Sequence, residues 1–350
     1  MSGPFAVLDV DDTRWSSLWE RWPEREVWAH PSYAQLYEGD GARVVCASWE
    51  SDQGCVLYPM ILRDLEFERW WHSGLGPAVD IVSPYGYSGP FFWGHDPRSV
   101  AAPFWASFRA WAEEVGAVSE FVRFALFSEE LLPYPGETEV RLQNAVRDLT
   151  PTEEAMWTDA KPKVRKNVKR ARAEGLTVEL DPKGARLDEF LAIYRRTMDR
   201  RGAGEYHRFP DKFFERIAHE LPDQHRFIHA FLGGRMVSTE LILLSATRAY
   251  SFLGGTDERA FPKRPNDLLR WESLLWAKEE GLRHFVLGGG LEMEDGILRH
   301  KLAFAPTGKM PFHIGHRVLR TDVYEELTAA RTRAETGWSP RPGWFPAYRA

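Results

Sequence analysis

The sequence lacks the residue patterns that metal sites, disulfide frameworks and membrane segments require. Its only cysteines, Cys46 and Cys55, allow at most one disulfide and have no metal-ligating neighbours. The histidines show no H-x-x-x-H or similar ligand spacing, so no metal site is predicted. No apolar run approaches the ~18–20 residues that span a bilayer, and the chain begins with acids where a secretory signal carries basic residues. We therefore expect a cytoplasmic protein without a transmembrane segment.

Two further absences narrow the class of enzyme. The chain has neither the G-x-S-x-G elbow of α/β-hydrolases nor the P-loop of nucleotide-hydrolysing enzymes. Its formal net charge is −6 at pH 7, which excludes a protein that binds nucleic acid over its whole surface. Contact with RNA would have to be made by a local basic patch.

The length of 350 residues fits two domains of about 150–200 residues each. The segment LTPTEEAMW at Thr150 contains a helix-capping sequence, so we place the domains at 1–150 and 151–350. In the first domain, β-branched and apolar residues predict strands at Arg43–Glu50 and Cys55–Leu62. The segment 80–92, DIVSPYGYSGPFF, has closely spaced Gly and Pro and is predicted to be a shaped loop.

The second domain shows a clear alternation of helices and strands. Helices are predicted before a glycine-punctuated run of strands, and a further helix capped by Asn266 or Asp267 runs to Glu280. This order is typical of an acetyltransferase-type α/β domain. The predicted helices are Val164–Glu174, Leu187–Arg200 and Asp211–Leu221, and the predicted strands are 226–231, 236–244, 248–253 and 284–287.

The helix KPKVRKNVKRARAEG is strongly basic within an acidic chain. Arg165, Lys169 and Arg172 lie at i, i+4 and i+7, so they share one helical face and are suited to contact successive phosphates. The alternative is a solvated helix surface with no ligand. The seven cations of this segment are Lys161, Lys163, Arg165, Lys166, Lys169, Arg170 and Arg172.

A second candidate anion site lies in GGTDERAFPKRPNDLLRWE. A strand ending in Gly-Gly leads to Lys263, Arg264 and Asn266 at a helix N-terminus, whose free N–H groups and dipole favour an anion. In an acetyltransferase-type domain this turn holds the pyrophosphate of coenzyme A. The usual turn sequence, Q/R-x-x-G-x-G/A, is absent here, which weakens the prediction of coenzyme A. A purely structural cap with exposed cations is the alternative.

Lys301 follows a triple glycine in GGGLEMEDGILRHKLAFAP and stands among apolar residues. A lysine in this setting is suited to bind phosphate or to stabilise the oxyanion that forms when an amine attacks an ester. The alternative is a lysine that extends along a strand edge to reach solvent.

Glu240 lies in VSTELIL, where strand alternation places it on one face with Ser238 and Ile242. A carboxylate among apolar neighbours is a candidate general base for an attacking ammonium. A buried structural Glu paired with an Arg is an equal alternative, and Asp257 is a weaker candidate for the same role.

Three tyrosines in loops are candidates for a ligand pocket: Tyr85 and Tyr87 in SPYGYSGP, and Tyr206 in GEYHRF. Each of them singly is more often a turn residue that covers the core.

Several segments, in this order along the chain, resemble the C-terminal half of FemAB/FemX-like proteins of the GNAT superfamily. They are PKVRKNVKRARAEGLTVE, YRRTMDRRGAGEYHRFP, MVSTELIL, YSFLGGTD, RPNDLLRWE, FVLGGG and DGILRHKLAFAP, and SPYGYSGP resembles a segment of the N-terminal half. The resemblance covers most of the chain and is dense from Trp157 to Phe312.

The resemblance implies two tandem GNAT-like α/β (α+β) domains with mixed sheets flanked by helices. It also implies an acceptor in a cleft between the domains and an aminoacyl-tRNA donor met by basic residues of the second domain. In that family a Phe/Lys element contacts the donor and assists the transfer, and the matching positions here are Lys301 and Phe304. Lys263, Arg264 and Arg165 would be phosphate contacts by location. No heptad pair for a coiled-coil arm is present, which weakens a cell-wall role.

From this resemblance we predict an aminoacyltransferase that moves an aminoacyl group from charged tRNA to an amine, forming an amide. The acceptor would be a natural-product intermediate or a peptidoglycan precursor, and no metal, ATP or other cofactor is needed because the tRNA ester is already activated. The runner-up is an acyl-CoA-dependent N-acyltransferase, and a non-enzymatic binding module is a third alternative. The sequence leaves the oligomeric state open.

Overall fold

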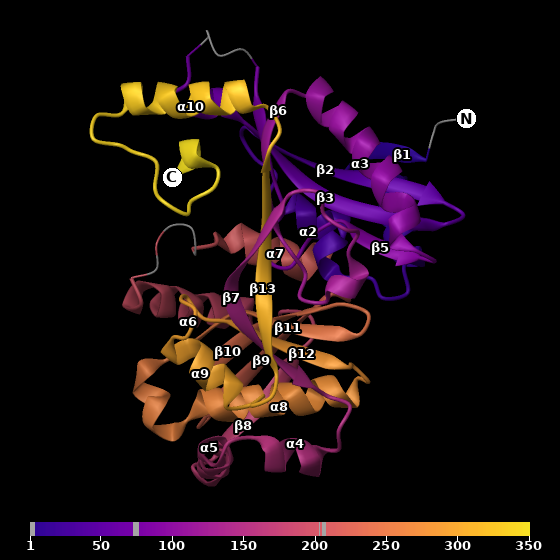
Figure 1. Cartoon of the computed structure of the whole chain (residues 1–350). Helices are drawn as coiled ribbons and strands as arrows, with labels where there is room; N and C mark the ends of the chain where they lie inside the picture. The colour runs from indigo at the N-terminus through magenta and orange to yellow at the C-terminus, as the bar shows by residue number, and fades with distance from the viewer. Residues whose placement is uncertain (1–3, 73–76, 203, 205–207) are drawn as a thin grey trace. The chain divides into compact units, whose positions relative to one another are not determined.

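The protein is described by a computed structural model that covers residues 4–72, 77–202, 204 and 208–350. The chain folds into two compact units, which we call unit 1 (Met1–Arg141 with Phe312–Ala350) and unit 2 (Leu142–Pro311). The chain passes from one unit to the other within two strands, β7 (Glu137–Asp148) and β13 (Lys309–Val318), both labelled in Figure 1.

Unit 1 is built on a mixed sheet. Its strands follow the order β1-β2-β3-β4-β6-β13, and β5 pairs with β3 beside this path. The pair β4 and β6 is parallel, whereas the other described pairs of this sheet are antiparallel. The strands are β1 (Phe5–Asp9), β2 (Ala42–Ser51), β3 (Gly54–Asp64), β4 (Val79–Val82), β5 (Phe91–Gly94) and β6 (Ala117–Arg123).

The helices of unit 1 bury aromatic residues against this sheet. Phe104 and Phe108 of α3 pack in one core with Ala117 of β6, whereas the next residue, Val118, packs in a second core with α10. Successive residues of a strand point to opposite faces, so β6 carries a core on each side. The helices are α1 (Thr13–Arg21), α2 (Pro31–Gln35), α3 (Pro97–Glu114) and α10 (Thr321–Ala334).

The C-terminal segment belongs to unit 1, whereas the sequence places all of 151–350 in the second domain. Leu327 and Ala330 of α10, together with Tyr348, are buried against Leu65 and Trp70 of the first part of the chain. This apolar contact joins segments far apart in sequence and leaves no periodic signal in either of them. It is the physical reason why the observed unit differs from the predicted domain.

Unit 2 is built on a second mixed sheet. Its strand order is β7-β12-β11-β10-β9-β8, in which β11 and β12 are parallel and the neighbours are antiparallel. The alternating helices and strands predicted from the sequence are confirmed with shifts of a few residues at the ends. The further strands are β8 (Leu176–Asp181), β9 (His225–Leu232), β10 (Arg235–Leu244), β11 (Arg248–Thr256) and β12 (His284–Gly289).

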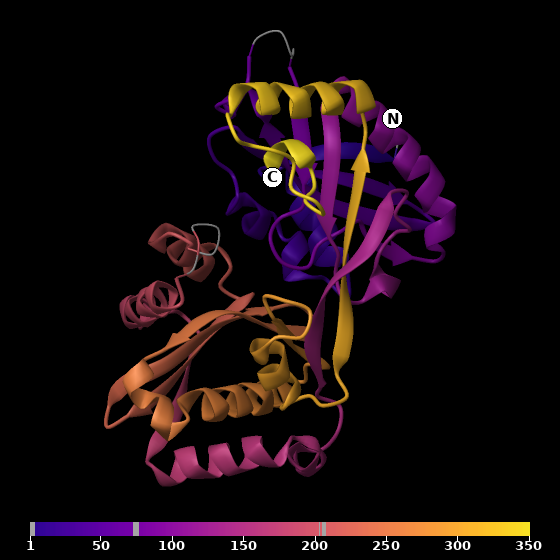
Figure 2. The ribbon, with the colours of Figure 1, turned by 60° about the vertical axis from the view of Figure 1, so that its left-hand side comes forward.

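Helices cover both faces of this sheet, as Figure 2 shows. On one face α8 packs on the strands and α5 packs on α8, so that Val164, Val168, Leu268 and Leu274 share one core. On the other face α6 and α7 enclose an aromatic cluster. The helices are α4 (Glu153–Asp159), α5 (Pro162–Ala173), α6 (Leu187–Arg200), α7 (Asp211–Glu220), α8 (Pro265–Glu279) and α9 (Gly296–Leu302).

The parallel strands β11 and β12 pair over only part of their length. Their register runs from Arg248 opposite His284 to Tyr250 opposite Val286. Beyond this point β11 continues to Thr256 along β10, and β12 continues to Gly289 along β7. The two strands therefore separate, and residues 251–255 of β11 are only half-buried at this separation.

Candidate active site

Lys301 lies on α9 beside the end of β12. Its Nζ donates a hydrogen bond to the carbonyl oxygen of Gly289, at 2.8 Å. Burial, followed by the positive charge of Arg270, lowers the pKa of Lys301 to about 7, although Glu240 and Asp295 act in the opposite direction. Lys301 is on helix α9 rather than at a strand edge. Its lowered pKa makes the neutral amine accessible near pH 7.

The triple glycine before α9 allows the chain to wrap closely around Asp295. Asp295 caps α9 by accepting hydrogen bonds from the backbone N–H of Leu298 at 2.8 Å and of Leu291 at 2.7 Å. A Cβ atom on Gly290 would lie 2.2 Å from Oδ1 of Asp295, so this position requires glycine. The loop and cap together fix the direction in which α9 presents Lys301.

Glu240 is buried on β10 and pairs with Arg270 of α8, with 3.0 Å between Oε1 and Nη2. The hydroxyl of Ser251 on β11 donates to the same carboxylate oxygen. The structure thus contains the Glu–Arg pairing that the sequence leaves as an alternative to a free general base. Oε1 is occupied by two donors, and only Oε2 is available to accept a proton or a ligand group.

The same register joins a second pair of residues on these two elements. Ser238, two residues before Glu240, donates to the side-chain oxygen of Asn266 at 2.8 Å, and Asn266 precedes Arg270 by one helical turn. Residues two apart on the strand share one face, and residues four apart on the helix share one face, so the two pairs lie side by side. The predicted strand alternation of Ser238 and Glu240 correctly places both side chains toward α8.

The N-terminus of α8 differs from the prediction. The helix begins at Pro265, and its N-cap is Arg264 in the left-handed conformation, with φ 64°. Neither Asn266 nor Asp267 caps the helix. Asn266 accepts from Ser238 and Thr256, and Asp267 accepts from the side chain of Asn167 of α5 at 3.1 Å. These two side chains hold α8 against neighbouring elements.

Four cations predicted to contact phosphate are engaged in intramolecular interactions. Arg264 donates from Nη1 to the carbonyl oxygen of Phe261 at 3.1 Å, and Arg172 forms an ion pair with Glu272 at 2.7 Å. Lys263 forms an ion pair with Glu174, and Arg165 donates to the backbone carbonyl oxygens of Thr158 and Ala160 where α4 ends. Lys169 is exposed on α5. Other exposed cations are Lys161, which precedes α5, and Lys163, Lys166, Arg170 and Arg172 of α5.

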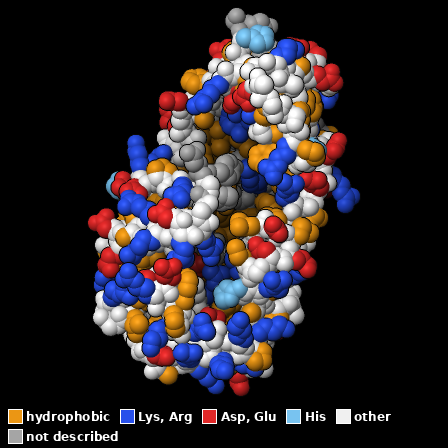
Figure 3. All heavy atoms as spheres, turned by 90° about the vertical axis from the view of Figure 1, so that its left-hand side faces the viewer, with side chains coloured by type: hydrophobic (Ala, Val, Ile, Leu, Met, Phe, Trp, Pro, Cys, Tyr) orange, Lys and Arg blue, Asp and Glu red, His pale blue; other side chains and the backbone are white. Residues whose placement is uncertain are grey.

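Figure 3 shows Lys and Arg side chains scattered widely over the surface of unit 2. The same view shows a hollow in this unit with Lys and Arg on its wall and a histidine at its rim. A cationic hollow of this kind favours an anionic ligand group.

Phe304 and Asp257 have structural partners. Phe304 is fully buried in the core of unit 2, where its ring contacts His300, with 5.5 Å between centroids. It supports α9 from inside rather than lining a surface. Asp257 caps a short 3-10 helix and pairs with Arg235 at 2.7 Å; burial opposes ionisation, but the hydrogen bonds from Arg259 and Arg235 lower the pKa of Asp257 overall.

Lys301 belongs to unit 2, whereas two of the predicted tyrosines belong to unit 1. Tyr85 and Tyr87 belong to unit 1 and are half-buried; Tyr87 packs edge-on against Trp28 and Phe312, with 5.4 and 5.7 Å between ring centroids. Burial raises the pKa of Tyr87. Tyr206 lies outside the described residues.

The sequence reasoning did not identify Arg270 or Asp295 as site residues. A signal for Arg270 exists in RPNDLLRWE, where it stands one turn after Asn266 on the helix. A signal for Asp295 is the Asp-Gly before an apolar run, which is typical of a helix start. Within the described residues no cluster of three or more His, Cys, Asp or Glu has metal-binding geometry. Similarly, no helix in the described ranges is long and apolar enough to cross a bilayer.

Comparison with known proteins defines the class of this fold. Residues 159–301 match the acetyltransferase (GNAT) domain family. These residues include the strand separation, Glu240, Arg270 and Lys301. Unit 2 therefore carries an acyltransferase-type GNAT domain.

Nearly the whole chain aligns with several solved structures of similar length. FemX is 12% identical, with a TM-score of 0.66, and the match covers 92% of this chain and 99% of that chain. The C-terminal domain of a protein from Agrobacterium fabrum, described as a putative lysylphosphatidylglycerol synthetase, is 16% identical with a TM-score of 0.56, covering 93% and 97%. L-PGS from Bacillus licheniformis is 14% identical with a TM-score of 0.53, covering 95% and 98%. Among curated proteins, none matches this sequence.

The chain therefore has a FemX-like fold, and its residues 159–301 match the GNAT domain family. The predicted resemblance and the predicted fold class, α/β with mixed sheets flanked by helices, are confirmed at the level of the fold.

Proposed function

We propose that the protein is an aminoacyltransferase that moves an aminoacyl group from aminoacyl-tRNA to an amine. The GNAT domain over 159–301 supports acyl transfer, and the similar folds include FemX and proteins described as lysylphosphatidylglycerol synthetases. We propose that it acts in the cytoplasm, where charged tRNA is found. The acceptor is proposed to be an amine of a natural-product intermediate or of a peptidoglycan precursor.

The observation that carries this proposal is the position of Lys301 beside the separated strands. In the proposed reaction the neutral amine nitrogen attacks the ester carbonyl carbon, a C–N bond forms, and negative charge develops on the carbonyl oxygen. Protonated Lys301 stabilises this oxyanion. The C–O bond to the ribose then breaks, the ribose oxygen takes a proton, and the amine loses its proton to Oε2 of Glu240 or to water.

The donor's phosphates are proposed to lie along the exposed cations of α5. Lys163, Lys166 and Lys169 are exposed and stand within one helix, so their ammonium groups are accessible to phosphates. Tyr85 and Tyr87 of unit 1 are proposed to contact the acceptor. The reaction needs no metal and no ATP, because the ester supplies the free energy.

The test is product formation from defined components. The purified protein is incubated with a mixture of aminoacyl-tRNAs and candidate amines, and amide products are identified by mass spectrometry. Lys301→Met is expected to lower the rate by about 10²–10³. Lys278→Met is the matched control, because Lys278 also donates to a backbone carbonyl, that of Leu149 at 2.8 Å. Equal rates for Lys301→Met and the control would contradict the assignment of Lys301.

A second candidate is an acyl-CoA-dependent N-acyltransferase. The match to the acetyltransferase (GNAT) domain favours it, as does the N-terminus of α8, which has no side-chain cap. Separate calorimetric titrations with coenzyme A and with charged tRNA distinguish the two donors. Binding of coenzyme A with no response to tRNA would favour this second function.

A further inference from the structure

The ion pair of Glu240 and Arg270 leaves three hydrogen-bonding atoms without a partner. Within the described part of the chain, Oε2 of Glu240 and both Nε and Nη1 of Arg270 are buried and make no hydrogen bond. The side chains are 7% and 16% exposed, so little water reaches them. The bonds that do form involve Oε1 of Glu240, Nη2 of Arg270 and the hydroxyl of Ser251.

Unpartnered buried polar atoms cost folding free energy, and folded proteins rarely keep several of them in one place without a use. A closer, two-point ion pair would satisfy Oε2 of Glu240 and Nε of Arg270, but Nη1 of Arg270 would still lack an acceptor. The pair is therefore incomplete as a structural element. It presents one free negative acceptor beside a free positive donor.

The location of the pair connects it to acyl transfer. Glu240 is on β10 and Ser251 is on β11, at the point where β11 separates from β12. Lys301 donates to Gly289 at the end of β12, the strand from which β11 separates, and Arg270 and Glu240 act electrostatically on it. The free atoms thus belong to the site at which the acyl group is proposed to react.

The charges of the two free groups select a ligand with complementary parts. Oε2 of Glu240 suits an ammonium group, and Nη1 of Arg270 suits a carbonyl oxygen. An aminoacyl ester carries both groups on adjacent carbons. A simple acyl group such as acetyl carries the carbonyl alone and leaves the carboxylate unpaired.

We propose that Glu240 and Arg270 recognise the α-ammonium and the carbonyl oxygen of an aminoacyl group, and so select a donor with a free α-amine over an N-blocked or simple acyl donor. This inference rests on the proposed function and deepens it by defining the class of acyl group. Arg270 would hold the carbonyl oxygen next to Lys301. With Oε2 held by the donor's α-ammonium, Glu240 would act as a specificity residue, and the acceptor amine would lose its proton to water.

The test compares each of a panel of α-amino acid amides with its N-acetylated form, using the full chain and NMR titration at pH 6.5, where the α-amine is protonated. The wild-type protein is expected to bind at least one free amide about tenfold or more tightly than its N-acetyl form. Glu240→Gln is expected to bring this ratio close to one. Ser251→Ala is the matched control, because it removes a partner of Oε1 and leaves Oε2 in place.

Three results would overturn the inference: no amide binds, free and N-acetylated amides bind equally to the wild-type protein, or Glu240→Gln keeps the wild-type ratio. Should Glu240→Gln fail to fold, the affinity ratio of the wild-type protein and the amide binding of Arg270→Lys decide. This substitution keeps the positive charge but removes the longer reach of the guanidinium. Transfer assays separate the two proposals. Transfer that uses N-acetylaminoacyl-tRNA as well as aminoacyl-tRNA rejects this inference alone, whereas selective amide binding without any transfer from tRNA rejects the proposed function.

Discussion

The Nζ atom of Lys301 lies 2.8 Å from the carbonyl oxygen of Gly289, across the loop that joins β12 to α9. The backbone accepts one hydrogen bond from the amine without supplying a full negative charge. Burial therefore dominates and lowers the pKa of Lys301 to about 7. A lysine with this pKa changes its charge near neutral pH.

The pH dependence of the reaction is expected to report the titration of Lys301. If the protonated form stabilises the oxyanion, kcat/KM falls as pH rises through about 7, because the free protein loses the cation. Lys301→Arg keeps the charge at all accessible pH values and is expected to remove this decline. The measurement is a kcat/KM profile from pH 6 to 9.

The titration can also be observed directly. Reductive ¹³C-methylation and NMR are expected to show one lysine resonance, absent in Lys301→Arg, that titrates far below the others. A profile that rises with pH would assign Lys301 to proton abstraction by the neutral amine. It would contradict the role as an oxyanion-stabilising cation.

A glycine substitution tests how the loop holds Lys301. Gly290→Ala places a Cβ atom 2.2 Å from Oδ1 of Asp295 and is expected to displace the cap of α9, lowering the free energy of unfolding by about 1–3 kcal/mol. The transfer rate of the folded protein is expected to fall as well, because α9 carries Lys301. Gly296→Ala is the control, because its added Cβ meets only Arg299 Nη2, at 3.9 Å. Urea denaturation and rate measurements on both variants check the expectation, and equal behaviour would contradict it.

Much of unit 2 is predictable because local periodicity and the final contacts agree. The helix Leu187–Arg200 has the predicted ends, and β10 and β11 differ from prediction by a few residues only. Gly202 just after the helix and the Gly233-Gly234 pair before β10 mark such ends without reference to tertiary structure. Consistency between local signals and packing is the physical basis of this agreement.

Long-range pairings were not predictable from the same signals. The segment 132–139 reads as a loop by its Pro and Gly, yet β7 begins at Glu137 and runs for 12 residues. The ion pairs of Lys263 with Glu174 and of Glu240 with Arg270 join residues far apart in sequence. A charge pattern shows that a cation is present but does not show which carboxylate lies opposite, so Lys263 was interpreted as a free phosphate contact.

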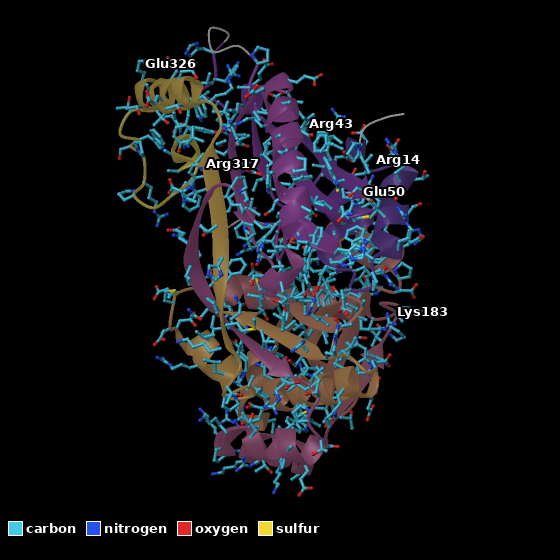
Figure 4. The ribbon with its side chains drawn as sticks, turned by 45° about the vertical axis from the view of Figure 1, so that its right-hand side comes forward. Arg14, Arg43, Glu50, Lys183, Arg317 and Glu326 are labelled. Atoms are coloured by element: carbon cyan, nitrogen blue, oxygen red, sulfur yellow. The ribbon has the colours of Figure 1, made fainter. Side chains whose placement is uncertain are left out.

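The exposed lysines of α5 provide a test of the donor. The triple variant Lys163→Glu, Lys166→Glu and Lys169→Glu is expected to weaken tRNA binding and to reduce the slope of log Kd against log salt by about 2–3. All three side chains are exposed, so stability is expected to change little. Lys183→Glu, exposed in the loop after β8 and labelled in Figure 4, is the control. An unchanged salt slope in the triple variant would exclude α5 as the contact surface.

Unit 1 contains a buried charge pair whose role is structural. Arg317, labelled on β13 in Figure 4, pairs with Glu120 of β6, whose side chain is fully buried. The carboxylate also accepts hydrogen bonds from Tyr58 at 2.6 Å and from Tyr134 at 3.0 Å. Both carboxylate oxygens of Glu120 accept hydrogen bonds, whereas Nη2 of Arg317 is buried without a hydrogen-bond partner. Removal of the cation therefore leaves a buried carboxylate uncompensated.

Arg317→Met is therefore expected to lower the free energy of unfolding by about 3–5 kcal/mol. Arg43→Met is the control, because the Arg43 pair with Asp9 is solvent-exposed on both sides and is expected to contribute less than about 1 kcal/mol. Glu120→Gln combined with Arg317→Met is expected to recover part of the loss, since the neutral amide no longer needs a cation. Urea denaturation of the three variants measures these differences. A loss in Arg317→Met no larger than in the control would show that the tyrosine hydroxyls alone compensate Glu120.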